Sequence, residues 1–295
     1  MNKENLKEYL LRDAVSMRSM SFSENYIKES ISLTSKWAAT HLLSGLTDPY
    51  EGRQVARLME NQRIQNEDKN EGYRLPENVM SNWNESQWKR VSIPAIRRIY
   101  GPFIPYDLVS VQVISNPEDR LYYTSLDERQ SSVGIQTRTR FFGREWWTGV
   151  TNEDSTLEDE AHALAQFSQR YSNEVTREII KDLTNNAGSI VPAEYKDQDQ
   201  LLSLVEGMSA YISAKIKGRE ASWIVASPVV AELLKPFVNE WEEDDSEDEW
   251  YKLSVKYRGM VKDKWKLYED PLQTQMLMGH KDNKNHYFSG YFYCP

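Results

Sequence analysis

The longest regular pattern of apolar positions in the chain runs from Ser155 to Gly188. Apolar residues recur there at steps of three and four, which predicts a helix with one face packed against the core and the other exposed to solvent. Ser155 and Glu158 suit an N-terminal capping box, and Gly188 suits the C-terminal turn. Such a helix would be about 45 Å long, which predicts an elongated molecule. The apolar positions are Leu157, Ala161, Leu164, Phe167, Tyr171, Val175, Ile179 and Leu183.

The chain beyond this helix predicts a compact region of helices and strands. Residues 198–217 repeat the helical spacing, and residues 223–226 form a short apolar run that is typical of a buried strand. Ser227 and Pro228 suit the N-cap and the first position of another helix. From Tyr257 onward the chain is rich in strand patterns.

The first 60 residues contain only short helical patterns separated by polar stretches. Their apolar density is too low for a separate domain, so we expect an arm that other parts of the assembly hold in place. Residues 61–72 are almost wholly polar, which predicts a linker or an extended crossing.

Residues 92–116 combine prolines with alternating valines. Pro94 suits the first turn of a short helix, which Pro102 and Pro105 would end. The alternation that follows predicts a half-buried strand. Its apolar positions are Val109, Val111 and Val113.

Residues 121–150 predict a long two-stranded hairpin that turns near Gly143. Arginines point to one side of its first strand, and Trp146 and Trp147 lie on the return strand. An isolated hairpin is only marginally stable in water, so we expect this one to lie on another surface.

Composition narrows the class of protein. The chain of 295 residues has a net charge of −9, which argues against nucleic-acid binding as its main role, because phosphate contacts need clustered Lys and Arg. Cys294 is the only cysteine, which excludes an intrachain disulfide framework and fits a reducing compartment. No apolar run approaches the roughly 20 residues of a membrane span, so we expect a soluble cytoplasmic protein. The 9 Trp and 17 Tyr fit either contact surfaces between proteins or an aromatic core.

Two clusters of ionisable residues are candidate sites. Eight acidic residues lie between Glu240 and Glu249, and a solvated loop is a better interpretation than a weak divalent-cation site. His280, Asp282 and His286 could bind a metal, but their spacing matches no common zinc pattern, and a surface turn is favoured.

The sequence gives little support to an enzyme. The nucleophile elbow, the phosphate-binding loop and the dinucleotide-binding glycine motif are all absent from it. Cys294 is best interpreted as a small buried apolar residue. We therefore assign no catalytic residue, cofactor or metal ligand.

Several of these segments resemble the major capsid protein of tailed bacteriophages of the T-even type. The most specific is IPAIRRIYGPFIPYDLVSVQVISNP at 93–117. SNEVTREIIKDL at 172–183 is similar to the end of that family's spine helix, and SWIVASPVVAELL at 222–234 to part of its axial domain. WKLYEDP at 265–271 and SGYFYCP at 289–295 resemble later strands.

The resemblance implies an α+β protein with the HK97-like capsid fold. It divides the chain into an N-terminal arm, the first part of a peripheral domain, an extended hairpin loop, a spine helix, and an axial domain with C-terminal strands. These five parts correspond to residues 1–91, 92–120, 121–154, 155–188 and 189–295.

The implied function is self-assembly into hexamers and pentamers of an icosahedral head, which encloses DNA without sequence-specific binding and without catalysis. The protein would be made in the host cytoplasm and reside in the virion, with vertex, decoration or scaffolding proteins as further partners and no membrane contact. A vertex protein or an encapsulin-like shell of the same fold is the nearest alternative, and a metal-dependent enzyme is the alternative from another class.

The hairpin is the expected contact between subunits. Its arginines project from an otherwise acidic protein, so we expect them to meet carboxylates of a neighbouring subunit, although a solvated strand face is the simpler interpretation. The expected contact residues are Arg138, Arg140, Arg144, Trp146 and Trp147.

Two features depart from the family. Relatives continue past a segment like GYFYCP, so either this chain is incomplete or its peripheral sheet closes differently. Relatives also often lose an N-terminal segment to a protease that cuts after Glu in a Leu/Ile-x-Glu context. The triplets at 58–60 and 27–29 fit that context, although such triplets are common by chance.

Overall fold

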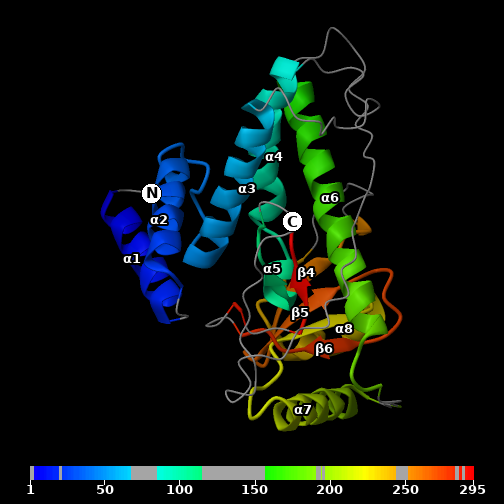
Figure 1. Cartoon of the computed structure of the whole chain (residues 1–295). Coiled ribbons are helices and arrows are strands. Elements are labelled where there is room, and N and C mark those ends of the chain that lie inside the picture. Colours follow the sequence, from blue (N-terminus) through cyan, green and yellow to red (C-terminus); the bar gives the residue numbers. More distant parts are fainter. Residues whose placement is uncertain are drawn as a thin grey trace.

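The computed structural model describes residues 3–19, 22–67, 85–114, 157–190, 194, 197–243, 252–282, 286–287 and 290–295. In these ranges the protein combines a row of helices with a five-stranded sheet, which confirms the α+β class (Figure 1). The predicted hairpin at 121–150 and Ser155, the proposed N-cap of the long helix, lie outside the described residues, whereas Glu158 lies within that helix.

Three helices form the N-terminal part of the row. They are α1 (Lys3–Ser19), α2 (Glu24–Ala38) and α3 (Pro49–Glu67). Each buries a narrow apolar stripe, and these stripes belong to the same hydrophobic cluster as the centre of the molecule. The sequence predicted only short helical segments here, because such narrow stripes leave the overall apolar density low.

The predicted linker at 61–72 is wrong for its first part, since α3 continues to Glu67. Two contacts explain why so polar a stretch remains helical. Arg63 pairs with Glu60 one turn earlier at 2.7 Å, and Asn61 donates to the carbonyl of Ile114 at 3.2 Å. A polar helix can therefore be stabilised by ion pairs between residues three or four positions apart and by hydrogen bonds to a neighbouring segment.

Helix α4 (Glu85–Tyr100) contains Pro94 in its interior, so the prediction that this proline begins a short helix is wrong. Proline removes one backbone hydrogen bond, but the residues after it anchor the helix. Ala95, Ile99 and Tyr100 are buried. Pro105 instead begins the short α5 (Pro105–Leu108).

Strand β1 (Ser110–Val111) is shorter and more deeply buried than its alternating pattern predicted. It pairs in parallel with β7 (Phe292–Tyr293). On its other side, side chains of α3 replace a neighbouring strand. Tyr50 donates to the carbonyl of Val111 at 2.5 Å, and the Gln54 side chain accepts from the amide of Val113 at 2.9 Å. Because side chains supply these bonds, the whole segment is buried without a longer ladder.

The predicted long helix is confirmed as α6 (Leu157–Asn185), 29 residues long. It packs beside α4, as Figure 1 shows in green and cyan. Its apolar stripe contacts the central cluster through Phe167, Tyr171, Val175, Ile179 and Leu183. The helix ends three residues before Gly188, where the amide of Asn186 bonds to the carbonyl of Asp182 at 3.1 Å.

The second half of the chain forms the five-stranded sheet and two helices that cover one of its faces. The strand order is β3-β4-β5-β2-β6, with only the β2–β5 pair parallel. The strands are β2 (Trp223–Ala226), β3 (Val238–Asn239), β4 (Lys256–Val261), β5 (Trp265–Glu269) and β6 (Leu277–Gly279). The helices are α7 (Gln198–Lys215) and α8 (Pro228–Leu234), and a short 3-10 turn (Lys235–Phe237) follows α8.

Strand β2 shows how the sheet separates two cores. Trp223 and Val225 belong to the cluster on the side of α3, α4 and α6, whereas Ile224 and Ala226 belong to the cluster under α7 and α8. This is the alternation that a strand buried on both faces requires. The predictions of a buried strand at 223–226 and of a helix capped by Ser227 are both confirmed.

Candidate assembly site and the polar network behind it

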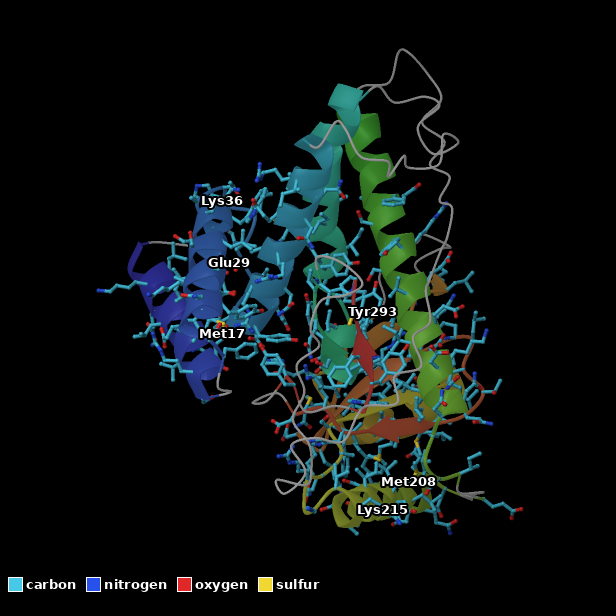
Figure 2. All side chains as sticks on the ribbon, viewed as in Figure 1. Met17, Glu29, Lys36, Met208, Lys215 and Tyr293 are labelled. Carbon is cyan, nitrogen blue, oxygen red and sulfur yellow. The ribbon has the colours of Figure 1, made fainter. Side chains whose placement is uncertain are left out.

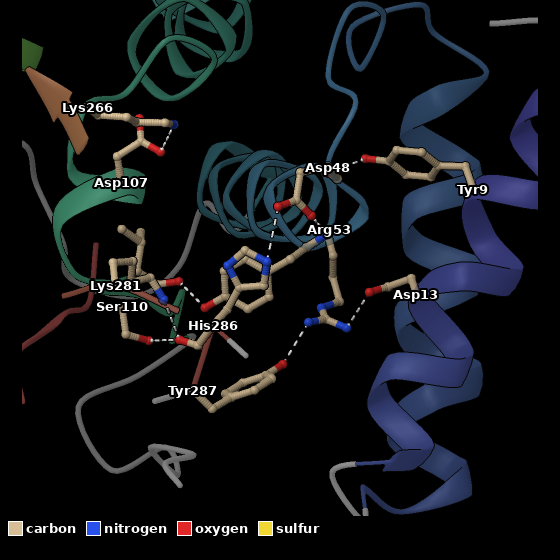
Figure 3. Close-up of polar contacts among 12 residues, drawn as sticks. Tyr9, Asp13, Asp48, Arg53, Asp107, Ser110, Lys266, Lys281, His286 and Tyr287 are labelled. Carbon is tan, nitrogen blue, oxygen red and sulfur yellow. Dashed lines mark hydrogen bonds and ion pairs between the residues drawn. The ribbon is translucent and has the colours of Figure 1, made fainter. Parts of the chain in front are cut away.

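The expected contact residues of the hairpin, Arg138, Arg140, Arg144, Trp146 and Trp147, all lie outside the described residues. In the described part of the chain, polar side chains form a largely buried network between the N-terminal helices and the C-terminal segment (Figure 3). It joins α1 and α3 to Ser110 and to residues 281–287, which are far apart in the sequence.

Arg53 of α3 is at the centre of the network. Its guanidinium donates to Asp13 of α1 at 2.8 Å and to the hydroxyl of Tyr287 at 2.7 Å. The Arg53 and Asp13 side chains are only 2% and 3% exposed. Burial raises the pKa of Asp13 to about 6, although the charge of Arg53 acts in the opposite direction. This ion pair therefore fixes the distance between two helices inside a nonpolar environment.

His286 is held between α3 and the segment before it. Its Nε2 lies 3.0 Å from the carboxylate of Asp48, and its ring stacks on Tyr50 at 4.1 Å between centroids. Burial acts to raise the pKa of Asp48, but the hydrogen bond and charge of His286 outweigh it and hold that pKa below its ordinary value. Tyr9 of α1 donates to the backbone carbonyl of Asp48 at 2.8 Å.

The carbonyl of His286 accepts two further hydrogen bonds. Lys281 Nζ donates to it at 3.0 Å, and Ser110 Oγ donates at 2.6 Å. Lys281 is 2% exposed, and this burial lowers its pKa to about 8. The C-terminal segment is thus fixed to the end of β6 and to β1 at one backbone oxygen.

Asp107 of α5 makes a separate polar contact with the sheet. Its carboxylate accepts from Lys266 Nζ and from the hydroxyl of Tyr268, both at 2.5 Å and both from β5. These two bonds hold α5 against β5.

The three candidate metal ligands have separate partners. His280 Nδ1 lies 2.5 Å from the carbonyl of Glu220, Asp282 pairs with Arg219 at 3.5 Å, and His286 contacts Asp48. Among the described residues, no group of three or more His, Cys, Asp and Glu side chains is arranged to hold a metal ion. Cys294 lies beside β7 and is partly buried, which raises the pKa of its thiol.

A groove runs along α8 on the opposite side of the sheet from the network. Its volume is about 630 Å³, and its apolar walls are Pro228, Val229, Leu233 and Trp241. Charged residues complete the lining, namely Glu232, Lys235, Glu243, Arg258 and Glu269. The acidic run begins beside it: residues 240–243 are described, and the remainder of the run to 249 lies outside the described residues.

The charges in the groove are partly paired. Arg258 forms two hydrogen bonds with Glu269, at 2.9 and 3.2 Å, and its guanidinium lies 5.3 Å from the ring centre of Trp241. Lys235 lies over the same ring at 4.9 Å and pairs with Glu243 at 3.3 Å. Trp241 is therefore held by two cations at the edge of the groove.

The sequence did not reveal the buried network. Asp13 and Arg53 occupy core positions of amphipathic helices, and a charged residue at such a position is the only local signal of a buried pair. A second signal was the presence of two polar residues, Ser110 and Gln112, in an otherwise apolar strand segment. Their alternation with valines predicted a solvent-exposed face, but both are buried.

Comparison with known proteins identifies the class. Residues 152–295, which include α6, the five-stranded sheet and β7, match the family model of the major capsid protein Gp23. That family is structural and non-enzymatic, and its members are capsid proteins of T4-like bacteriophages. The match covers just under half of the chain, and over these residues the chain is similar to the major capsid protein Gp23 family. No curated protein matches the chain, and neither does any solved structure. In the described residues, no helix is both long and apolar enough to cross a membrane.

Proposed function

We propose that copies of this protein assemble into the hexamers and pentamers of an icosahedral head that encloses phage DNA. The observation that carries the proposal is the match of residues 152–295 to the major capsid protein family. Similarity to that family implies a shell built from many copies of the chain and a location in the virion, and assembly would take place in the host cytoplasm.

We further propose the HK97-like division of the chain. In this arrangement α6 is the spine helix, residues 189–295 form the axial domain with its C-terminal strands, and residues 92–120 begin the peripheral domain. The loop at 121–154 and the arm at 1–91 would extend toward neighbouring subunits. The length of α6 supports this division, as do its bonds to the sheet region. Asn173 accepts from the amide of Val255 at 2.9 Å, and Arg177 pairs with Asp270 at 3.5 Å.

The hairpin is the proposed contact between subunits, with Arg138, Arg140 and Arg144 facing carboxylates and Trp146 and Trp147 supplying apolar area. A chain with a net charge of −9 offers many carboxylates to such a loop. Vertex, decoration and scaffolding proteins would be further partners of the shell.

Charge reversal tests this proposal. Replacing the three arginines by Glu should prevent or slow assembly, measured by sedimentation velocity, while the far-UV circular dichroism of the subunit stays unchanged. A matched control reverses three exposed lysines outside the hairpin, Lys28, Lys181 and Lys252, and should assemble normally. Normal assembly of the arginine variant would refute the assignment of the hairpin.

A further inference from the structure

Helix α1 has a second apolar face that points away from the molecule. Leu11 and Val15 lie one helical turn apart and are 59% and 57% exposed. Arg12 is exposed beside them. The opposite face of the helix is buried through Tyr9 and Met17, whereas the outer pair stays exposed in the described part of the chain.

The α8 groove has features that complement this face. Val229 on its wall is 69% exposed, and Leu233 and Trp241 continue the apolar surface. Glu232 and Glu243 lie at its rim with side chains 68% and 67% exposed. The apolar walls of the groove therefore complement Leu11 and Val15, and the carboxylates at its rim complement the positive charge of Arg12.

The charge balance favours this pairing. Glu232 and Glu243 both pair with Lys235, at 3.9 and 3.3 Å. The other cation of the groove, Arg258, is bonded to Glu269 and so does not neutralise either of them. The rim thus has one uncompensated negative charge. Arg12 forms no ion pair in the part of the chain that the structure describes.

The two surfaces cannot meet within one molecule. Figure 1 shows α1 at the outer edge of the helical row and α8 beside the sheet below α6. When complementary surfaces lie on different sides of a subunit, the contact joins copies head to tail and produces rings or open chains. The contact is smaller than an interface that holds a stable dimer, so it would act together with others around a ring.

We propose that Leu11 and Val15 of one copy dock in the α8 groove of a second copy, with Arg12 directed at Glu232 and Glu243. This inference rests on the proposed self-assembly of the chain, and it names one pair of surfaces through which the copies would contact each other.

Disulfide trapping tests the contact directly. In a Cys294→Ser background, Val15→Cys combined with Val229→Cys should give a ladder of covalent oligomers under mild oxidation. The matched control combines Val15→Cys with Leu272→Cys, because Leu272 is 64% exposed but does not line the groove, and should give no ladder. Adding Arg12→Glu should reduce the ladder at least fivefold, and adding Glu232→Lys and Glu243→Lys to that variant should restore it.

Each result has one interpretation when sedimentation is measured on the same samples. Assembled particles in which the 15–229 pair gives no more cross-linking than the 15–272 pair would overturn the docking contact and leave the shell function standing. A protein that stays monomeric at all concentrations and gives no ladder would overturn both.

Discussion

Arg53 and Asp13 form a 2.8 Å ion pair that links α3 to α1 in the interior of the protein. Both charges are shielded from water, and Arg53 is also bonded to Tyr287, 234 residues later in the sequence. The pair therefore connects the first helix of the chain to its last segment.

Removing one member of this pair should be strongly destabilising. Asp13→Ala leaves the Arg53 guanidinium buried without its carboxylate, and such a change typically costs about 3–5 kcal/mol of the free energy of unfolding. Urea denaturation of the subunit checks this value. The surface pair Arg18–Glu24, at 2.9 Å, is the control, and Glu24→Ala should change the midpoint very little. Equal effects of the two substitutions would contradict the account.

Stability should fall as the pH rises from about 4 to 7. The folded-state pKa values of Asp13 and Glu51 are raised by burial to about 6 and about 7, from ordinary values of 3.8 and 4.5. Between those limits the folded state binds more protons than the unfolded state, so raising the pH favours unfolding. For Asp13 the change of about two pKa units corresponds to roughly 3 kcal/mol.

Urea denaturation of the wild type and of Asp13→Asn across this pH range separates the contribution of Asp13 from other groups. The variant should lose the part of the slope between pH 4 and 6 and keep the part that Glu51 contributes. Parallel stability curves for the two proteins would show that Asp13 does not take up a proton on folding.

Gly52 is required for the contact between α1 and α3. A Cβ at this position would lie 1.9 Å from the Tyr9 hydroxyl, which itself donates to the Asp48 carbonyl at 2.8 Å. Gly52→Ala should therefore lower the thermal midpoint, despite the better helix propensity of alanine, and Tyr9→Phe in the same chain should recover part of the loss. The control is Gly207→Ala in α7, where a Cβ meets nothing within 4 Å, and it should raise stability by about 0.5–1 kcal/mol.

Glu60 should resist proteolysis in the folded protein, although its sequence context fits a maturation site. It lies within α3, and its carboxylate accepts from Lys36 at 2.7 Å and from Trp37 at 3.0 Å. Burial acts to raise the pKa of Glu60, but these bonds and that of Arg63 lower it to about 2. A glutamate-specific protease should cut after Glu60 readily in urea and at least tenfold more slowly in buffer. Equal rates would show that this end of α3 opens in the native protein.

The features that the sequence predicted correctly depend on residues that are close together in the sequence. The stripe of α6, the apolar run of β2 and the Ser227–Pro228 helix start are local signals, and each appears in the structure (Figure 1). The features it missed depend on contacts across the chain. Pro94 stays within a helix because buried neighbours anchor α4, and the β1 segment is buried because α3 side chains bond to its backbone.

The same distinction applies to the buried polar contacts, both in the candidate site and elsewhere in the core. Tyr293 lies at the centre of the molecule, where Figure 2 labels it, and its hydroxyl is 3.5 Å from that of Tyr100. Nothing in the sequence near Tyr293 indicates a partner 193 residues earlier, just as nothing near Asp13 indicates Arg53. Family resemblance, by contrast, identified the class of protein because it compares whole segments rather than single contacts.

Electron microscopy of the purified protein tests the central claim most directly. Samples at micromolar concentration, with and without polyethylene glycol as a crowding agent, should contain rings of five or six subunits or closed icosahedral shells, with one copy of α6 and of the five-stranded sheet per subunit in the reconstruction. Single subunits alone under both conditions, in protein whose circular dichroism shows it to be folded, would contradict the assignment of a self-assembling capsid protein.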